Sequence, residues 1–374
     1  MDTIRQYFDS LKGKEIAVVG LGVSHRPLIR LLLQEGLSVT AYDKKTMEEL
    51  GDFGKEYSQK GVRFVLGEGY LDHLKGDLIF KTPGMRGDLP AFERARACGS
   101  VVTSEMEVFF DVCPCSIIAV TGSDGKTTTT TLTGKFLGAA DGGKTYVGGN
   151  IGEPLLDKCQ NMSASDNAVL ELSSFQLMTA PSPDIAVMTN LTPNHLNWHV
   201  DMEEYVSAKE SIFLFQQAEN KLIVNKDDSY AARCASKAKG TVKFTSGKQK
   251  ADVWFDETGI YRGETLVVKD TEIRLVGIHN RYNYAQAICA TEGLVSDEAI
   301  RKVARDFGGV EHRCEFVREK DGVKYYNSSI DSSPTRTAAC VNSFKVPLVV
   351  ICGGYDKNIP LEPLGELFPG RVKH

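Results

Sequence analysis

The segment of this 374-residue chain that most restricts its fold is SIIAVTGSDGKTTTTTLTGKFL, residues 116–137. Its apolar beginning predicts a buried strand, and the stretch after the Gly-Lys pair can continue as a helix. A strand, a glycine-containing turn and a helix in this order predict a phosphate-binding loop, because backbone N–H groups at a helix N-terminus attract anions. The loop is shorter than the usual motif, which has a glycine where this chain has Val120.

This loop predicts binding of a nucleoside triphosphate together with magnesium. Lys126 would meet the terminal phosphates, and the hydroxyl of Thr127 would reach a magnesium ion. The alternative is a glycine-rich turn with a surface lysine, but the strand before the loop and the helix after it favour phosphate binding. The residues predicted to hold the nucleotide here are Gly122, Ser123, Asp124, Gly125, Lys126, Thr127 and Thr128.

Short apolar runs alternate with helical patterns along most of the chain, which is typical of parallel sheets covered by helices. We therefore predict an α/β protein with three domains, over residues 1–97, 98–296 and 297–374. The first domain has the pattern of a nucleotide-binding unit, and the second contains the phosphate loop. Expected strands lie at residues 15–20, 37–43, 62–66, 77–81, 116–122, 167–174, 184–190, 221–225, 323–327 and 347–354, with short strands over 241–277 and a helix from about Tyr282.

Composition restricts the class of protein and its compartment. A formal net charge of -5 without a long basic run argues against a nucleic-acid partner. No apolar run reaches the roughly 20 residues of a membrane helix, and the first 20 residues do not have the pattern of a signal peptide. The nine cysteines show no paired CxxC spacing and are expected to be reduced and mostly buried. These features predict a cytoplasmic protein.

A second glycine cluster follows the first expected strand, at Gly20-Leu-Gly22-Val-Ser-His25. It lacks the third glycine of the dinucleotide fingerprint, although Asp43 lies at the end of the next strand, where an acid that binds ribose would be. A dehydrogenase is one interpretation, and a tight turn in any doubly wound domain is the other.

The helical segment EEYVSAKESIFLF, residues 203–215, contains a lysine on its apolar side. On a helix, Lys209 shares a face with Val206 and Phe213. From spacing alone, a lysine whose stem covers apolar surface while its amine reaches water is the simpler interpretation. The alternative is a buried, neutral amine that reacts with carbon dioxide and becomes a carbamate able to bind metal.

Two further motifs offer possible metal ligands near strand ends. Glu171 follows a buried strand, where its carboxylate can reach a phosphate-bound magnesium, or it is a surface acid at a sheet edge. His195 and His199 are four residues apart, but no acid ligand set accompanies them, so a transition-metal site is not indicated.

Taken together, the short TGxxGKT loop and several other runs resemble the Mur ligase family, which joins amino acids to cell-wall precursors with ATP. The runs are GGNIG (148–152), LELSSFQL (170–177), NLTPNHL (190–196), HNRYN (279–283), EHRCE (311–315) and GGYDKN (353–358). The resemblance covers nearly the whole chain. Within the family, the Ser-Phe-Gln-Leu run resembles the members that add D-glutamate to UDP-N-acetylmuramoyl-L-alanine. The resemblance to the family implies an N-terminal Rossmann-like domain, a central P-loop ATPase domain and an incomplete C-terminal Rossmann-like domain.

The resemblance also implies a set of site residues for ATP, two magnesium ions and the two substrates. Lys126, Lys209 as a carbamate, and His195 would be catalytic, and the implied metal ligands are Thr127, Glu171, His195 and Lys209. Asn283, Arg313 and Asp331 would join the loop around the nucleotide. The substrate contacts would come from Val23, Ser24, Asp43, Thr82, Pro83, Gly84, Asn150, Ser173, Phe175, Gln176 and Lys357. His199 has no implied role and is expected to be structural, and the protein is expected to be a monomer.

Two departures from the family pattern lead to further expectations. Ser328 stands where the family has an acid, and we expect Asp331 to supply that carboxylate. The chain ends about one strand-helix unit after PLVVICGG, so either an end segment is omitted or the third domain is only partly formed. We expect a protein that ends there to ligate D-glutamate poorly. Another amide ligase of the superfamily, such as a folylpolyglutamate synthase, and an inactive nucleotide-binding regulator are the alternative functions.

Overall fold

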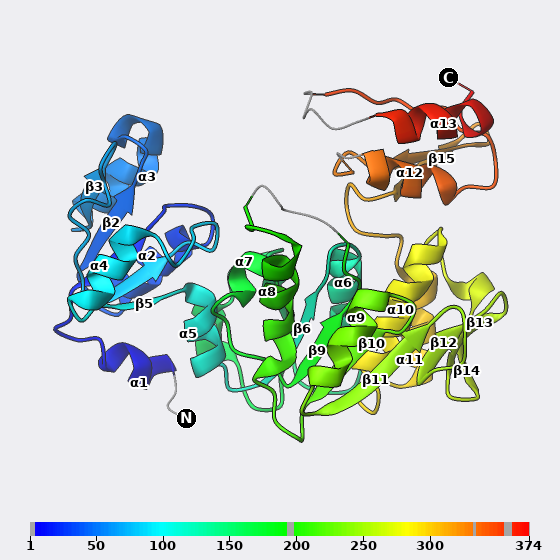
Figure 1. Ribbon diagram of the computed structural model, residues 1–374, viewed down its shortest axis with the longest axis horizontal. Helices are drawn as coiled ribbons and strands as arrows, with labels where there is room; N and C mark the ends of the chain where they lie inside the picture. Colours follow the sequence, from blue (N-terminus) through cyan, green and yellow to red (C-terminus); the bar gives the residue numbers. More distant parts are fainter. Residues whose placement is uncertain (1–3, 193–197, 332–333, 355–360, 374) are drawn as a thin grey trace.

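The computed structural model describes residues 4–192, 198–331, 334–354 and 361–373, which form three parts with a sheet in each (Figure 1). The strands are β1 (Ile16–Val19), β2 (Val39–Asp43), β3 (Arg63–Leu66), β4 (Leu78–Lys81), β5 (Val101–Thr103), β6 (Ser116–Thr121), β7 (Thr145–Gly149), β8 (Asn167–Glu171), β9 (Ile185–Met188), β10 (Lys221–Asn225), β11 (Thr241–Ser246), β12 (Val253–Phe255), β13 (Gly259–Arg262), β14 (Thr265–Lys269), β15 (Glu315–Lys320) and β16 (Val323–Asn327).

Helices connect most of these strands and cover the two larger sheets. The α-helices are α1 (Ile4–Asp9), α2 (His25–Gln34), α3 (Met47–Gln59), α4 (Pro90–Ala97), α5 (Glu105–Val112), α6 (Lys126–Gly138), α7 (Ser174–Leu177), α8 (Met202–Leu214), α9 (Ser229–Cys234), α10 (Ile278–Ala290), α11 (Asp297–Asp306), α12 (Pro334–Asn342) and α13 (Glu362–Arg371). Three 3-10 helices are η1 (Leu156–Asn161), η2 (Ala235–Lys237) and η3 (Asp270–Glu272).

The first sheet has the order β3-β2-β1-β4-β5, with every pair parallel. All four residues of β1 are buried, as expected for a strand covered on both faces in a parallel sheet. Alternate side chains face two different cores: Ile16 and Val18 lie in one, and Ala17 and Val19 lie in the other. The predicted α/β class is confirmed for this part of the chain.

The second sheet has nine strands in the order β14-β13-β12-β11-β10-β9-β6-β8-β7. It is parallel from β12 to β7, and β13 and β14 extend it as an antiparallel edge. Ile117 and Ala119 face the core under α5, α7 and α8, whereas Ile118 and Val120 face the core under α6, α10 and α11. This alternation in β6 fixes which face each helix covers.

The order of the second sheet determines where a ligand can bind. Strand β6 lies between β8 and β9, although β7 follows it in sequence, so the chain reverses its direction of progress at β6. In open parallel sheets, ligands bind beyond the carboxyl ends of the strands at such a reversal. The loop after β6 is therefore at the position that favours binding.

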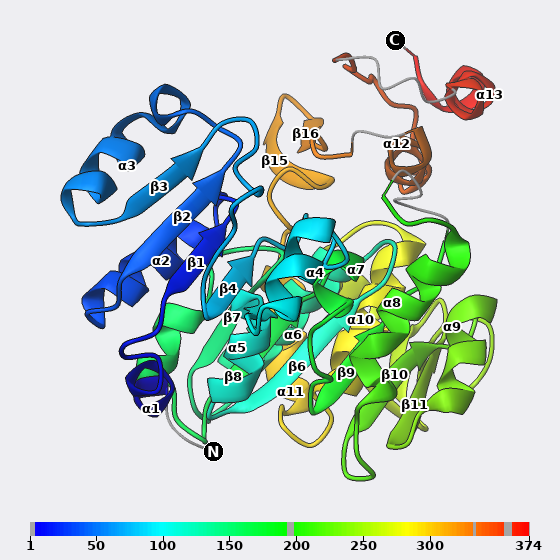
Figure 2. The same ribbon diagram turned by 60° about the vertical axis from the view of Figure 1, so that its left-hand side comes forward.

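The first part and the middle part share one hydrophobic core. Phe8 of α1, Leu32 of α2, Phe109 of α5 and Leu156 of η1 belong to the same cluster of buried residues. Figure 2 shows the first sheet beside the helices that cover the middle sheet. Apolar burial is the main favourable contribution to folding, so this shared core stabilises the arrangement of the two parts.

The third part differs from the prediction. Its described residues contain an antiparallel hairpin of β15 and β16 with α12 and α13, and no parallel sheet is formed among them. The predicted strand at residues 347–354 is wrong: Leu348 makes only an isolated bridge with Val372, and Val349 and Ile351 are 68% and 98% exposed. An apolar run becomes a strand only where neighbouring strands satisfy its backbone, and no strand among the described residues pairs along this run.

Other expectations are confirmed or corrected by details of the fold. The first sheet continues to Thr103 and the middle core includes Phe307, so both extend past the predicted boundaries at 97 and 296; the division into domains remains a prediction. The helix expected from about Tyr282 begins at Ile278. All nine cysteines are free thiols, but only four are buried, because Cys98 and Cys352 are exposed and three others are partly exposed.

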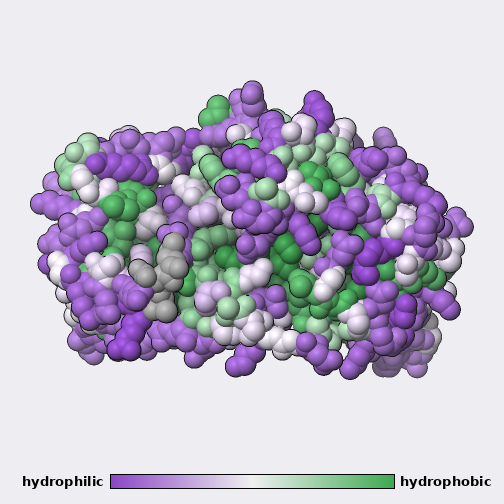
Figure 3. Space-filling model, turned by 90° about the horizontal axis from the view of Figure 1, so that it is seen from below, coloured by the Kyte–Doolittle hydropathy of each residue, from purple (hydrophilic) through white to green (hydrophobic). Residues whose placement is uncertain are grey.

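The surface is mostly hydrophilic, in agreement with the share of charged residues in the chain. On the face drawn in Figure 3, hydrophilic residues predominate along the rim, and hydrophobic residues gather in smaller areas between them. Among the helices that the structure describes, none is both long and apolar enough to cross a membrane.

A buried acid in the shared core predicts a pH-dependent stability. Burial raises the pKa of Glu105 to about 7, and its carboxyl group accepts a hydrogen bond from the backbone N–H of Leu156. Between the unfolded pKa near 4.5 and this folded pKa, the folded state binds more protons, so stability falls as pH rises.

We expect the wild-type free energy of unfolding to fall by about 2 to 3 kcal/mol more than that of Glu105→Gln between pH 5 and pH 8, as a shift of this size implies. Urea denaturation followed by circular dichroism measures the difference. Glu257→Gln, at an exposed position, is the control and should follow the wild type. Equal pH dependence in wild type and Glu105→Gln would contradict the prediction.

Candidate active site

The loop between β6 and α6 has a backbone that requires its two glycines. Gly125 precedes α6 with φ 80°, and Gly122 has φ 148°. A side chain at Gly122 would overlap Thr189, and one at Gly125 would overlap the amide of Asn283. The N-terminal N–H groups of α6 therefore face the space beyond the strand ends, as the sequence predicts.

Residues from neighbouring strand ends hold this loop in place. The backbone N–H of Asp124 donates to Oδ1 of Asn190 at 2.9 Å, and the carbonyl oxygen of Asp124 accepts from Thr189 and Asn190 at 2.6 and 3.0 Å. Ser123 is bonded to the carbonyl oxygen of Thr192 at 2.8 Å and to the hydroxyl of Tyr205 at 2.9 Å. The loop is thus preorganised by hydrogen bonds that leave its remaining N–H groups for a ligand.

Lys126 lies at the start of α6 and folds back onto the loop. Its Nζ donates to the carbonyl oxygens of Gly122 and Ser123 at 3.1 and 3.0 Å. Burial lowers the pKa of Lys126, although Glu171 and Asp124 act in the opposite direction. A bound phosphate would supply the negative charge that this buried ammonium group lacks.

The oxygen atoms of Thr127 and Glu171 meet at the same edge, as predicted. Thr127 Oγ1 donates to Glu171 Oε2 at 2.7 Å, and Asn150 Nδ2 donates to Glu171 Oε1 at 2.9 Å. Glu171 is 2% exposed, so it is not a surface acid. Magnesium prefers oxygen ligands and takes one or two carboxylates along with substrate phosphates, so these residues fit it.

Three of the four implied metal ligands, Thr127, Glu171 and Lys209, lie within the described residues. His195 lies outside the described residues. Over the ranges that the structure covers, no three His, Cys, Asp or Glu side chains are grouped to hold a metal ion. A metal site here would therefore depend on the substrate phosphates for further oxygen ligands.

Lys209 of α8 is buried, so the interpretation in which its amine reaches water is wrong. It is 2% exposed, its Nζ donates to Thr121 Oγ1 at 3.2 Å, and Nζ lies 4.9 Å from the centre of the Tyr205 ring. Burial lowers the pKa of Lys209 well below its ordinary value, and the charge of Lys126 lowers it further. The amine is thus placed to be neutral beside the phosphate loop.

His199 is structural, as expected, because both ring nitrogens have partners. Nε2 lies 2.9 Å from Ser174 Oγ and Nδ1 lies 3.3 Å from Glu204 Oε2. The side chain is 0% exposed, and burial lowers its pKa. A ring held in this way is not available to a metal ion.

Residues after α9 complete the edge of the loop. Asn283 of α10 accepts from Thr129 at 3.3 Å and donates to Asn280 at 3.1 Å. Arg313 contributes a positive charge that disfavours the ammonium form of Lys126, and its buried Nε has no partner among the described residues. Both positions agree with the predicted contacts to the nucleotide, which stay predictions.

Arg336 links the third part to this edge, and Asp331 is bonded within the third part. Ser328 Oγ donates to Asp331 Oδ2 at 2.7 Å, so the carboxylate reaches the position of the serine that departs from the family pattern. Arg336 of α12 forms an ion pair with Asp124 of the phosphate loop at 3.3 Å. No sequence pattern predicts a role for Arg336, since it is a single arginine in a polar stretch. Lys357 lies outside the described residues.

The first-domain residues predicted to bind the substrate gather where β1, β2 and β4 end. The N–H of Thr82 donates to Val19 at 3.0 Å, and Asp43 accepts from the N–H groups of Leu21 and Lys45. The order of the first sheet changes direction between β1 and β4, which is where ligands bind in such sheets. The predicted set at this edge is Val23, Ser24, Asp43, Thr82, Pro83 and Gly84.

Ser173 and Gln176 form a capping box at the start of α7. The N–H of Gln176 donates to Ser173 Oγ at 3.3 Å, and Gln176 Oε1 accepts from the N–H of Ser173 at 3.0 Å. Phe175 packs on Trp198, with ring centres 4.4 Å apart. These contacts give the three residues structural roles, and their predicted contact with substrate stays a prediction.

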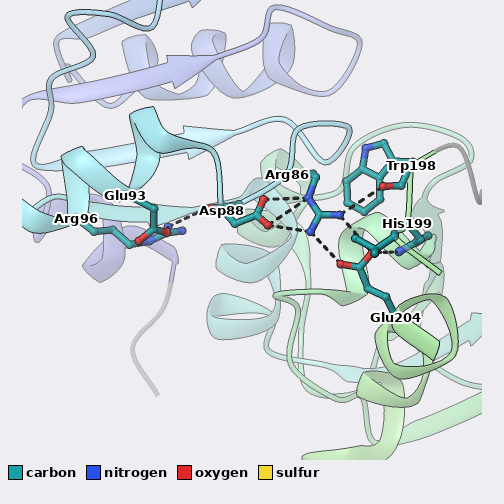
Figure 4. Close-up of polar contacts among 9 residues, drawn as sticks. Arg86, Asp88, Glu93, Arg96, Trp198, His199 and Glu204 are labelled. Atoms are coloured by element: carbon teal, nitrogen blue, oxygen red, sulfur yellow. Dashed lines mark hydrogen bonds and ion pairs between the residues drawn. The ribbon is translucent and has the colours of Figure 1, made fainter. Parts of the chain in front are cut away.

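An ion-pair cluster that the sequence did not predict joins the first part to the middle part. Arg86, in the loop after β4, contacts Asp88 and Glu204, and Trp198 and His199 lie beside it (Figure 4). Arg86 and Glu204 are 118 residues apart in sequence, so no local pattern reports their contact.

The comparisons with known proteins agree with this geometry. The sequence model of the protein family described as "Mur ligase middle domain" matches residues 120–291 of this chain. The chain is 51% identical over 363 residues to the UDP-N-acetylmuramoylalanine--D-glutamate ligase of Clostridium beijerinckii, covering 96% of this chain and 79% of that protein. It is 49% identical over 373 residues to the ligase of the same name from Clostridium novyi, covering 97% and 80%.

Solved structures support the fold. A murein peptide ligase from Psychrobacter arcticus has a TM-score of 0.57 at 18% identity and covers 88% of this chain and 75% of its own. A MurF ligase from Thermotoga maritima, solved in complex with ADP, has a TM-score of 0.52 at 17% identity and covers 93% and 77%.

The geometry of the phosphate loop predicts the effect of a single methyl group. In Gly125→Ala, the new Cβ meets Asn283 in a left-handed backbone, which costs about 1 to 3 kcal/mol. We expect ATP to bind at least about tenfold more weakly, which corresponds to about 1.4 kcal/mol. Titration calorimetry measures the affinity. Gly142→Ala has open space and an ordinary φ, so it should bind like the wild type; an unchanged affinity in Gly125→Ala would contradict the assignment.

Proposed function

Because this chain belongs to the Mur ligase family and is a ligase of peptidoglycan precursors, we propose that it joins D-glutamate to UDP-N-acetylmuramoyl-L-alanine through an acyl phosphate. The observation that carries this proposal is the meeting of Lys126, Thr127, Glu171 and Lys209 around one preorganised loop. The proposal includes a cytoplasmic location, where ATP and the uridine nucleotide are found, and action as a monomer.

ATP binds at the loop, with its phosphates on the N–H groups at the start of α6. Lys126 exchanges its bonds to the loop carbonyls for bonds to the terminal phosphate, and so keeps its ammonium group satisfied. Asn283 and Arg313 hold the remainder of the nucleotide, and the unpaired Nε of Arg313 is free to donate to it. Asp331 acts in place of the acid missing at Ser328.

Thr127 and Glu171, both of which offer oxygen ligands, would hold magnesium together with His195 of the implied set. When bound, magnesium neutralises charge on the transferring phosphoryl group. Asn150 holds the other carboxylate oxygen of Glu171 at 2.9 Å and so fixes its orientation.

Lys209 acts as a carbamate. Its neutral amine adds to carbon dioxide, one N–C bond forms, and one proton is released to give a carbamate anion. The burial of Lys209 and the charge of Lys126 favour the neutral amine that this addition needs. Once formed, the anion lies near Lys126 and is attracted by its ammonium group, which would repel the protonated amine.

The ligation consists of two displacements. A carboxylate oxygen of the L-alanine attacks the terminal phosphorus of ATP; an O–P bond forms, the bond to the bridging oxygen breaks, and ADP leaves. The amine of D-glutamate then attacks the carbonyl carbon, an N–C bond forms, and the C–O bond to phosphate breaks. Amide and inorganic phosphate result, and the amine loses its proton. The chain's contribution is to orient the reactants and stabilise charge.

The carbamate predicts a characteristic response to mutation. Lys209→Ala should lower kcat by about 10³-fold or more, which is the loss that removing one group stabilising the transition state can cause. Because a small acid can occupy the vacated space, added acetate or formate should restore part of the activity. The control is Lys302→Ala at an exposed position of α11. Wild-type turnover in Lys209→Ala, or the absence of any rescue, would reject the carbamate.

Isotope transfer tests the acyl phosphate. If the L-alanine carboxylate of the acceptor carries oxygen-18, the C–O bond that breaks in the second step leaves one labelled oxygen in inorganic phosphate. Mass spectrometry of the phosphate detects it. With L-glutamate in place of D-glutamate, little amide should form. Amide formation with unlabelled phosphate would exclude the acyl phosphate and leave the substrate assignment intact.

A further inference from the structure

Arg86 makes paired hydrogen bonds between the first part and the middle part. Its Nη1 and Nη2 donate to the two carboxylate oxygens of Glu204 at 3.2 and 2.9 Å, and Nε and Nη2 donate to Asp88 at 3.0 and 2.8 Å. Figure 4 shows the guanidinium group between these two acids. A guanidinium group bound to carboxylates in this way has a fixed orientation.

Glu204 in turn fixes the segment before α8. Its Oε2 accepts from the N–H of Val200 at 2.8 Å and lies 3.3 Å from Nδ1 of His199. The bond from Arg86, followed by that from Val200, lowers the pKa of Glu204 to about 2, so the carboxylate stays charged. His199 extends the connection, because its other nitrogen lies 2.9 Å from Ser174 Oγ on α7.

A second contact holds the same first-domain loop. Trp198 Nε1 donates to the carbonyl oxygen of Gly84 at 3.1 Å, and the guanidinium group of Arg86 lies 5.2 Å from the centre of the Trp198 ring. Gly84 belongs to the loop for which a uridine diphosphate contact is proposed. Two residues of this loop are therefore attached to the middle part at points close to each other.

Packed side chains connect the contact between Arg86 and Glu204 to the phosphate loop. His199 packs edge-on against Tyr205, with ring centres 5.4 Å apart. The Tyr205 hydroxyl lies 2.9 Å from Ser123 of the phosphate loop, and its ring lies against Nζ of Lys209. A displacement of Arg86 would thus be transmitted through packed side chains to the phosphate loop.

We infer that Arg86 is a positioning residue for ligation: by holding Glu204, it fixes the first-domain loop relative to the phosphate loop. This inference rests on the proposed function, in which UDP-N-acetylmuramoyl-L-alanine is a substrate. The first-domain residues predicted to bind this substrate lie where β1, β2 and β4 end, and its carboxylate must reach the terminal phosphate of ATP, so it would span both parts. The separation of the two binding regions then decides whether both ends are held at once, and an error in it weakens binding of this substrate.

The energetics favour a role in geometry over a role in stability. Arg86 and Glu204 are each about a quarter exposed, and pairs of this kind contribute little to folding. The shared apolar core already joins the two parts. Loss of Arg86 should therefore change how the substrate is held while the protein stays folded.

Steady-state kinetics on Arg86→Met test the inference. We expect KM for UDP-N-acetylmuramoyl-L-alanine to rise about tenfold, KM for ATP to stay within about twofold, and kcat to fall by less than about threefold, since a loss of binding geometry acts on the spanning substrate first. Arg305→Met is the matched control, because Arg305 also contacts two acids, Glu272 and Glu298, at the surface of the middle part. If Arg86→Met behaves like Arg305→Met, the inference is wrong.

A double-mutant cycle identifies the partner. Glu204→Gln should raise KM for the same substrate by a similar factor, and the double variant should be no worse than either single variant. Independent, multiplying effects would show that Arg86 does not act through Glu204 and would overturn the inference. If Arg86→Met fails to fold, Arg86→Lys, which keeps the charge but not the paired bonds, should still raise KM, and an unchanged KM in it would be equally decisive.

Fluorescence separates this inference from the proposed function. The chain has two tryptophans, and in a Trp254→Phe background Trp198 alone reports on the contact. Arg86→Met should raise the quenching of Trp198 by acrylamide, whereas Arg305→Met should leave it unchanged; no change in either variant overturns the attachment whatever the enzyme's substrate. If the wild type forms no amide from D-glutamate and the quenching still changes, the proposed function fails and the attachment of the loop is retained.

Discussion

The site depends on the parallel register of β6 with β8 and β9. In that register Val120 lies beside Glu171 on one side and Val187 on the other, so three strands end at one edge. The loop after β6 can then take its hydrogen bonds from the ends of its neighbours, through Thr189 and Asn190. Because each of those bonds requires the register to be correct, the strands position the anion-binding N–H groups, the carboxylate and the helix N-terminus together.

Burial of two amines sets the charge at this edge. Burial is the main cause that lowers the pKa of both Lys126 and Lys209, and the charge of Lys126 lowers the pKa of Lys209 further. Lys126 offsets part of this conflict between burial and charge by donating to two carbonyl oxygens of the loop. A nucleotide brings the negative charge that removes the conflict, so binding and the charge state of the site are coupled.

What could be predicted from the sequence follows from local patterns. The contact of Thr127 with Glu171 was predictable, because the ends of parallel strands meet at one edge. The burial of Lys209 was not predictable, since helical periodicity shows which face of a helix a residue occupies but not how completely other elements cover that face. Arg336 meets Asp124 across 212 residues, and no pattern in either segment reports that contact. PLVVICGG has the composition of a strand, but Val349 shows that composition does not supply a partner.

The two outer parts are attached to the middle part by different forces, and this difference determines which of them can move. The first part shares an apolar core through Phe8 and Phe109 and adds the paired bonds of Arg86. The third part reaches the phosphate loop through Arg336, whose side chain is about a third exposed, and an exposed ion pair contributes about 0 to 1 kcal/mol. The proposed ligation requires that a long substrate is held in register and that a second one is admitted. The apolar side would meet the first need, and the weakly attached side, where opening costs least, would meet the second.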